Sequence, residues 1–97
     1  MPAIGEDFNK VVDHLVKDGN LDAKLRKILE NEIRRRLTEY LLIDKEFQNK
    51  YEMTLEVFEE KEMVKKKNYS FEVENDYHDW DAASDAMKTL QKDLEYL

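Results

Sequence analysis

The segment from Asn68 to Ala83, NYSFEVENDYHDWDAA, combines large aromatic side chains with a dense set of carboxylates. From Glu72 to Asp85 it contains no lysine or arginine, whereas surface helices commonly alternate charges so that opposite signs pair four residues apart. Acids beside aromatic rings suit the binding of a basic protein, because the rings anchor and the acids attract the cations. The sequence predicts a partner-binding strip of seven residues: Glu72, Glu74, Asp76, Tyr77, Asp79, Trp80 and Asp81.

An ordinary amphipathic helix is the alternative interpretation of this segment. By helical spacing Val73, Tyr77 and Trp80 share one face, so they would be core residues and the acids would be the solvated side. This interpretation explains the aromatic residues well and the absence of basic residues less well. Both interpretations stay open at the level of sequence.

Residues suited to covalent or acid–base catalysis are scarce. The chain has no cysteine, its histidines are His14 and His78, and its serines are Ser70 and Ser84. No nucleophile elbow, phosphate-binding glycine loop or HExxH motif occurs. We therefore expect a protein that is not an enzyme and uses no cofactor.

One set of possible metal ligands lies at helical spacing: Glu74, His78, Asp81 and Asp85. Di-metal sites in helical bundles take Glu-x-x-His pairs from two helices and carboxylates from two more. Here a single helix contributes, with a different spacing. We expect a solvated face and no metal site.

A basic segment, KLRKILENEIRRRL, is the candidate for nucleic-acid contact through Arg34, Arg35 and Arg36. Acids interleave with its basic residues, and no helix-turn-helix or basic arm is evident. Residues 51–97 hold six lysines and thirteen acids, which accounts for the net charge of −7 and repels phosphate. We expect no general nucleic-acid binding, and expect the arginines to pair with acids of the last helix.

The composition predicts long helices, because only two glycines and one proline occur and charged residues make up 40% of the chain. Apolar periodicity places helices at about 4–17, 21–50, 54–63 and 70–96 in a single all-α domain over 1–97. Thr54 and Ser70 are the expected N-caps of the last two helices. We expect an antiparallel hairpin of the second and fourth helices, with a short helix at its turn. The first helix would pack on this hairpin, and KEMVKKKNY would be a solvated connector.

The second helix carries an apolar ladder in steps of four residues. Each step advances about 400°, so the ladder drifts by about 40° per step and one straight neighbour cannot cover it. This excess of apolar surface predicts a homodimer. The last helix repeats apolar residues at alternating steps of three and four, as a coiled-coil seam does. The ladder is Leu21, Leu25, Leu29, Ile33, Leu37 and Leu41, and the seam is Trp80, Ala83, Met87, Leu90, Leu94 and Leu97.

We expect neither a membrane span nor an export signal from this sequence. No run of about 18 apolar residues occurs, and MPAIGEDFNK lacks a basic region followed by a hydrophobic one. The absence of cysteine is compatible with the cytoplasm. We expect a cytoplasmic protein without a membrane partner.

Two motifs carry a resemblance over about residues 46–97: KYEMTLEVFEEK, and YSFEVENDYHDWDAA leading into a leucine-rich helix. They resemble a group of small helical prokaryotic proteins, antitoxin-like or uncharacterised, with a Lys-Tyr-Gly-Met-Thr motif and a Glu-x-Glu-x-Asp-Tyr-x-x-Trp segment. In this chain Glu52 replaces the glycine, which would let the second helix run further. The matching residues are Tyr51, Met53, Thr54, Phe58, Ser70, Glu72, Glu74, Asp76, Tyr77 and Trp80.

The resemblance implies an antitoxin-like interaction module that neutralises a small basic toxin through its acidic and aromatic helix. A structural homodimer or assembly adaptor without a toxin partner is the alternative.

Overall fold

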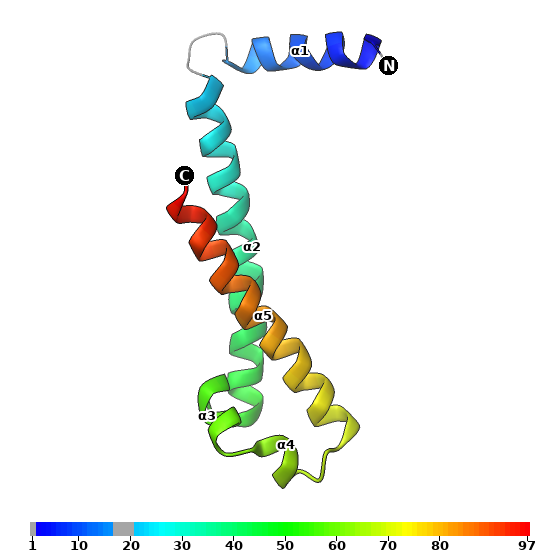
Figure 1. Cartoon of the computed structure of the whole chain (residues 1–97), viewed down its shortest axis with the longest axis vertical. Helices are drawn as coiled ribbons and strands as arrows, with labels where there is room; N and C mark the ends of the chain where they lie inside the picture. The colour runs from blue at the N-terminus through cyan, green and yellow to red at the C-terminus, as the bar shows by residue number, and fades with distance from the viewer. Residues whose placement is uncertain (1, 17–20) are drawn as a thin grey trace. The chain divides into compact units, whose positions relative to one another are not determined.

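The computed structural model describes residues 2–16 and 21–97, with side chains described for 7–14 and 21–97, and Figure 1 shows it. The expected end of the first helix at Lys17 lies outside the described residues. Every element in the described ranges is helical, so the all-α prediction is confirmed. The helices are α1 (Pro2–Val16), α2 (Leu21–Tyr51), α3 (Leu55–Glu60), α4 (Met63–Lys66) and α5 (Phe71–Glu95).

The chain divides into two compact units, residues 1–32 and 33–97. Among the described side chains of the first unit none is buried, and Phe8 of α1 is 66% exposed. The second unit contains the hydrophobic core, made of Phe58, Val73, Trp80 and Ala83. The candidate site is therefore built on the second unit.

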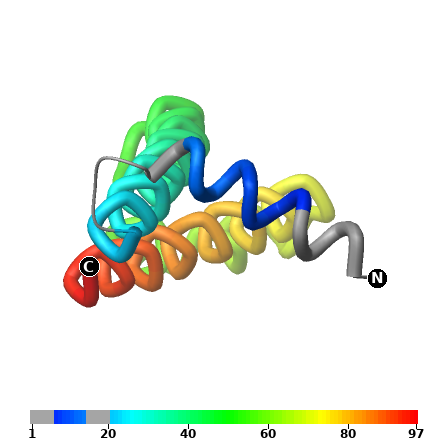
Figure 2. Tube along the Cα trace, turned by 90° about the horizontal axis from the view of Figure 1, so that it is seen from above, coloured from blue at the N-terminus to red at the C-terminus, as the bar shows by residue number. Residues whose placement is uncertain are grey.

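Within residues 33–97, α5 runs across the second part of α2, and α3 and α4 lie where these two helices diverge (Figure 1). Figure 2 shows the same divergence from above. Large aromatic side chains of α2, α3 and α5 contact one another between these helices. The partly buried apolar residues around this core are Phe47, Tyr51, Met53, Leu55, Met63, Val64 and Tyr77.

Trp80 joins three helices. Its ring stacks on Phe47 and Tyr51 of α2, with centroids 5.6 and 6.0 Å away, and meets Phe58 of α3 edge-on at 5.3 Å. Its Nε1–H donates to Oδ1 of Asp44 on α2 at 2.7 Å, so the buried indole leaves no polar atom unsatisfied. Trp80 has no exposed surface and is the centre of the core.

The turns of this unit are built without glycine. α2 ends at Tyr51 because Glu52 adopts a left-handed conformation with φ 56°, so a sharp turn forms there and the helix runs no further. Thr54 and Ser70 cap α3 and α5 by accepting from the N–H groups of Val57 and Val73 at 3.3 Å, which confirms the two predicted N-caps.

The expected connector KEMVKKKNY is partly helical, since Met63–Lys66 forms α4, so that expectation is corrected. The reason is a stable C-terminal cap. The Tyr69 N–H donates to the Val64 carbonyl at 2.9 Å, and the Asn68 N–H donates to the Lys65 carbonyl at 3.0 Å. This is the Schellman pattern, and Asn68 takes its left-handed position with φ 59°.

Replacing Glu52 by glycine tests how much the left-handed conformation of Glu52 destabilises the folded protein. A residue with a Cβ is disfavoured in the left-handed region, whereas glycine is not. We expect Glu52→Gly to raise the free energy of unfolding by about 0.5–1 kcal/mol in urea denaturation.

Glu52→Ala is the matched control, because it removes the same charge and keeps a Cβ. If alanine and glycine stabilised the protein equally, the effect would come from the charge at the helix end and not from the backbone.

Candidate functional site

The acids from Glu72 to Asp85, which include those of the predicted strip, form two rows on α5. Each residue advances about 100° around a helix, so acids two residues apart point in nearly opposite directions. Val73, Trp80 and Ala83 mark the line of α5 that faces the core. The first row, on one side of this line, contains Glu72, Asp76 and Asp79, and the second row, on the other, contains Glu74, Asp81 and Asp85.

Two acids of the first row, Glu72 and Asp76, share one cation of α2. Lys50 Nζ lies 2.8 Å from Glu72 Oε1 and 2.5 Å from Asp76 Oδ2. The Tyr51 hydroxyl donates to the same Asp76 oxygen at 2.5 Å. The cation at Glu72 and Asp76 is thus Lys50, in the last turn of α2. The lysine beside the tyrosine of the KYEMT motif was the sequence signal for it.

These contacts shift three pKa values. The pKa of Lys50 is raised because its ammonium donates to Asp76 and Glu72. Burial, together with the hydrogen bond to Asp76, raises the pKa of Tyr51 to about 12. Burial alone would raise the pKa of Asp76, but the hydrogen bonds from Lys50 and Tyr51 outweigh it and lower this pKa. Asp76 is therefore a carboxylate that holds α5 to α2.

Asp79, the last member of the first row, lines a groove of about 410 Å³ between α2 and α5. Glu46 is the other acid there, and no lysine or arginine lines it. The remaining lining residues are aromatic or aliphatic: Tyr40, Ile43, Phe47, Ala82 and Ala83. Asp79 thus lies beside apolar surface and apart from Asp81.

Asp81 of the second row lines a groove of about 310 Å³ between α2, α3 and α5, which we call the acidic groove. Four of its lining side chains are carboxylates and one is a lysine, Lys88. Asp81 is the only residue of the predicted strip among them. The carboxylates are Asp44, Glu56, Glu59 and Asp81, and the other lining residues are Gln48, Thr54, Leu55, Ser84 and Met87.

Two of these carboxylates are held in place by the fold. Asp44 accepts from Trp80 through Oδ1 and from Gln48 through Oδ2, both at 2.7 Å. Glu59 accepts from the Tyr77 hydroxyl at 3.1 Å. Among the described residues, the side chains of Glu56 and Asp81 make no hydrogen bond or ion pair, and both line the groove. The groove has the charge and the available acceptors to receive a cation.

The two aromatic residues of the predicted strip have different positions. Trp80 is fully buried, so it supports the strip from within and contributes nothing to its accessible surface. Tyr77 is half-buried, stacks on Phe58 at a centroid distance of 5.7 Å and reaches the surface at Glu59. Burial raises the pKa of Tyr77, and its hydrogen bond to Glu59 raises it further. Of the two rings, Tyr77 is the one that a partner can touch.

The arginines considered for nucleic acid do not form one patch. Arg34, Arg35 and Arg36 are exposed, and as consecutive helical residues they point about 100° apart. Arg35 Nη1 lies 2.6 Å from Glu39 Oε1, one turn along the same helix. Such an arrangement does not line up three cations along a phosphate backbone.

The structure also bears on metal binding and membrane insertion. In the residues that it describes, no three carboxylate or histidine side chains gather closely enough to hold a metal ion, and this includes the set around His78. None of the helices in these ranges has the length and apolar character needed to cross a bilayer.

Comparisons of the chain with models of protein families, with curated proteins and with solved structures found no match.

Replacing Asp76 by asparagine tests its role in joining α5 to α2. Because the pKa of Asp76 lies below its ordinary value of 3.8, its stabilising contribution is present above that value and is lost as pH falls through the folded-state pKa. We expect Asp76→Asn to lower the free energy of unfolding at pH 7 by about 1–2 kcal/mol, from the weakened Tyr51 hydrogen bond. The difference from the wild type should shrink as pH falls below 4.

The measurement is urea denaturation from pH 7 to pH 2, with Asp79→Asn as the control. Asp79 is one turn further along the same row and has no ion pair among the described residues. Equal pH profiles for both variants would contradict a special role for Asp76.

Proposed function

We propose that this chain is a non-enzymatic, antitoxin-like interaction module that neutralises a small basic toxin by binding it at the acidic groove. The observation that carries the proposal is the lining of this groove, which presents four carboxylates and a single lysine in about 310 Å³. A lysine or arginine of a partner entering the groove would meet Glu56 and Asp81, whose side chains make no hydrogen bond within the described residues. We place this interaction in the cytoplasm.

The surrounding charge favours the same kind of partner. Residues 51–97 carry thirteen acids and six basic residues, and such an excess speeds association with a cationic surface while repelling acidic ones. Glu74 and Asp85 extend the second row on either side of Asp81 along α5, and both are exposed. The partner-facing surface is thus the second row, with Glu56 and Glu59 from α3 and Asp44 from α2 added to it.

Of the residues that carry the family resemblance, Thr54 lines the acidic groove, and several others hold together the helices that form it. Tyr51, Phe58 and Trp80 form the aromatic core beneath it. Glu72, Asp76 and Tyr77 are motif residues that tie α5 to α2 and α3. We therefore assign most motif residues to holding the helices around the groove, and the acids that line the groove to contacting the partner.

A structural homodimer or adaptor is the second candidate, and one observation favours it. The first turns of α2 leave an apolar face largely exposed, with Leu25 at 48%, Ile28 at 57% and Leu29 at 51%. Exposed apolar surface of this kind marks a contact with another chain. Such a homodimer is compatible with toxin binding at the acidic groove, since the two surfaces use different residues.

The test is the double variant Glu56→Gln/Asp81→Asn, measured by calorimetry against the product of the neighbouring gene at two salt concentrations. We expect the affinity to fall at least about tenfold and its salt dependence to weaken, because two carboxylates that contact cations are lost. Co-expression should relieve growth inhibition by that product for the wild type and not for the variant.

The control is Asp93→Asn/Glu95→Gln, which removes two exposed acids from the end of α5, outside the groove. Equal affinity and salt dependence for both double variants would reject the groove as the binding site. If the neighbouring product did not bind at all and the chain sedimented as a stable dimer, the homodimer candidate would take its place.

A further inference from the structure

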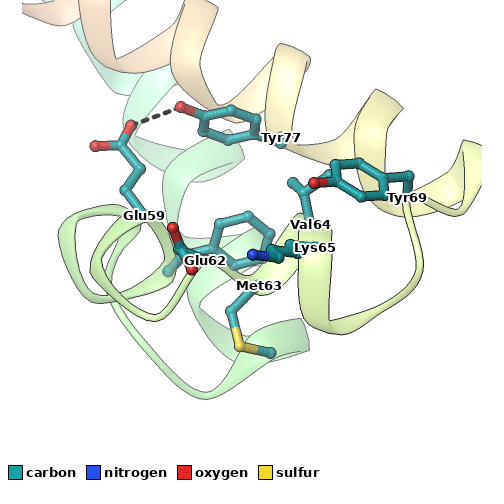
Figure 3. Close-up of a pocket in the computed structure, with 8 residues that line it drawn as sticks. Glu59, Glu62, Met63, Val64, Lys65, Tyr69 and Tyr77 are labelled. Atoms are coloured by element: carbon teal, nitrogen blue, oxygen red, sulfur yellow. Dashed lines mark hydrogen bonds between the residues drawn. The ribbon is translucent and has the colours of Figure 1, made fainter.

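Another pocket lies beside the acidic groove, where α3, α4 and α5 meet, and Figure 3 shows it. Its volume is about 250 Å³. Figure 3 shows Tyr77 above the pocket, Met63 below it, Glu59 and Glu62 on one side and Tyr69 on the other. We call it the aromatic pocket, and its lining residues are Phe58, Glu59, Glu62, Met63, Val64, Lys65, Tyr69 and Tyr77.

The lining of the aromatic pocket suits an apolar side chain. Phe58 is 1% exposed and belongs to the core, and Met63, Val64 and Tyr77 are partly buried against it. Tyr69, in contrast, is 59% exposed and forms the outer wall. An apolar group that entered would remove part of this apolar surface from water.

The backbone around the pocket is held in an unfavourable conformation. Glu62 and Tyr69 both have positive φ, 49° and 53°, which is disfavoured for any residue with a Cβ and unusual for a ring as bulky as tyrosine. The Tyr69 N–H bond to the Val64 carbonyl fixes this conformation. It places the ring at the mouth of the pocket, where it is mostly exposed to water. Conformations of this type concentrate at binding sites, where the surrounding structure maintains them.

The aromatic pocket and the acidic groove share a wall. Glu59 lines both, and its carboxylate accepts from the hydroxyl of Tyr77, a pocket residue, at 3.1 Å. A cation in the groove and an apolar side chain in the pocket would therefore lie on either side of one glutamate. Interfaces often combine a buried apolar anchor with charged contacts around it.

We infer that the aromatic pocket receives one apolar side chain of the basic partner, adjacent in the partner to the cation that enters the acidic groove. This inference rests on the proposed function. The charges at the rim set the orientation: Glu59 and Glu62 lie towards α3, and Lys65 is the one cation in the lining. The partner segment therefore carries its cations on the Glu59 side of the anchor and neutral residues on the other side.

The test uses two short capped peptides as probes and the full chain in solution. Each peptide has lysines on one side of a central residue and serines on the other, and the central residue is phenylalanine in one peptide and serine in the other. Binding is followed by the NMR signals of the chain. We expect the phenylalanine peptide to shift signals of Val64, Tyr69 and Glu59 and to bind about tenfold more tightly than the serine peptide. The serine peptide should shift only signals of the groove.

The variant Tyr69→Gly distinguishes an effect on peptide binding from an effect on the stability of the fold. Glycine relieves the left-handed conformation, so we expect the free energy of unfolding to stay equal or rise. Loss of the outer wall should bring the affinity for the phenylalanine peptide to within about twofold of that for the serine peptide. The matched control is Phe71→Ala, which removes an aromatic side chain that is 80% exposed and does not line the pocket.

Each outcome has a distinct meaning. If both peptides shift groove signals with equal affinity and the Val64 and Tyr69 signals stay in place, the inference is overturned and the proposed function stands. If neither peptide shifts groove signals, the proposed function fails. Equal losses for Tyr69→Gly and Phe71→Ala would also overturn the inference, because a general loss of aromatic surface would then explain the result.

Discussion

The burial of Trp80 against Asp44 is the interaction on which the second unit depends. A single indole touches Phe47 and Tyr51 of α2 and Phe58 of α3, and its N–H is satisfied by a carboxylate of α2. The core is small, so few other contacts would hold α5 beside α2 without this residue. The same hydrogen bond fixes Asp44 as part of the acidic groove, so the core and the candidate site share one contact.

The acids of α5 have two different roles, although they form a single strip in the sequence. Glu72 and Asp76 bind Lys50 and hold the helices together, whereas Asp81 lies in a groove with two acids of α3 and one of α2. The lack of lysine and arginine from Glu72 to Asp85 suits both roles. The partner of the first row is Lys50 on α2, and the proposed partner of the groove is another protein.

Much of the helical structure could be predicted from sequence, because apolar periodicity and N-caps are local signals. Thr54 and Ser70 were sufficient to place the starts of α3 and α5. The ends of helices were harder, since Glu52, Glu62 and Asn68 form left-handed turns without the glycine that usually marks them. The groove could not be predicted, because Asp44, Glu56 and Asp81 are far apart in sequence and meet only through the packing around Trp80.

The most direct test of this account is the accessibility of Trp80, which is the only tryptophan in the chain and can be followed by fluorescence. The account predicts blue-shifted emission that acrylamide barely quenches in the native protein. Both properties should be lost together, in the same cooperative urea transition that removes the helical signal in circular dichroism. Quenching of the native protein as strong as that of the unfolded chain would contradict the account, because neither the core nor the groove built on it would then exist.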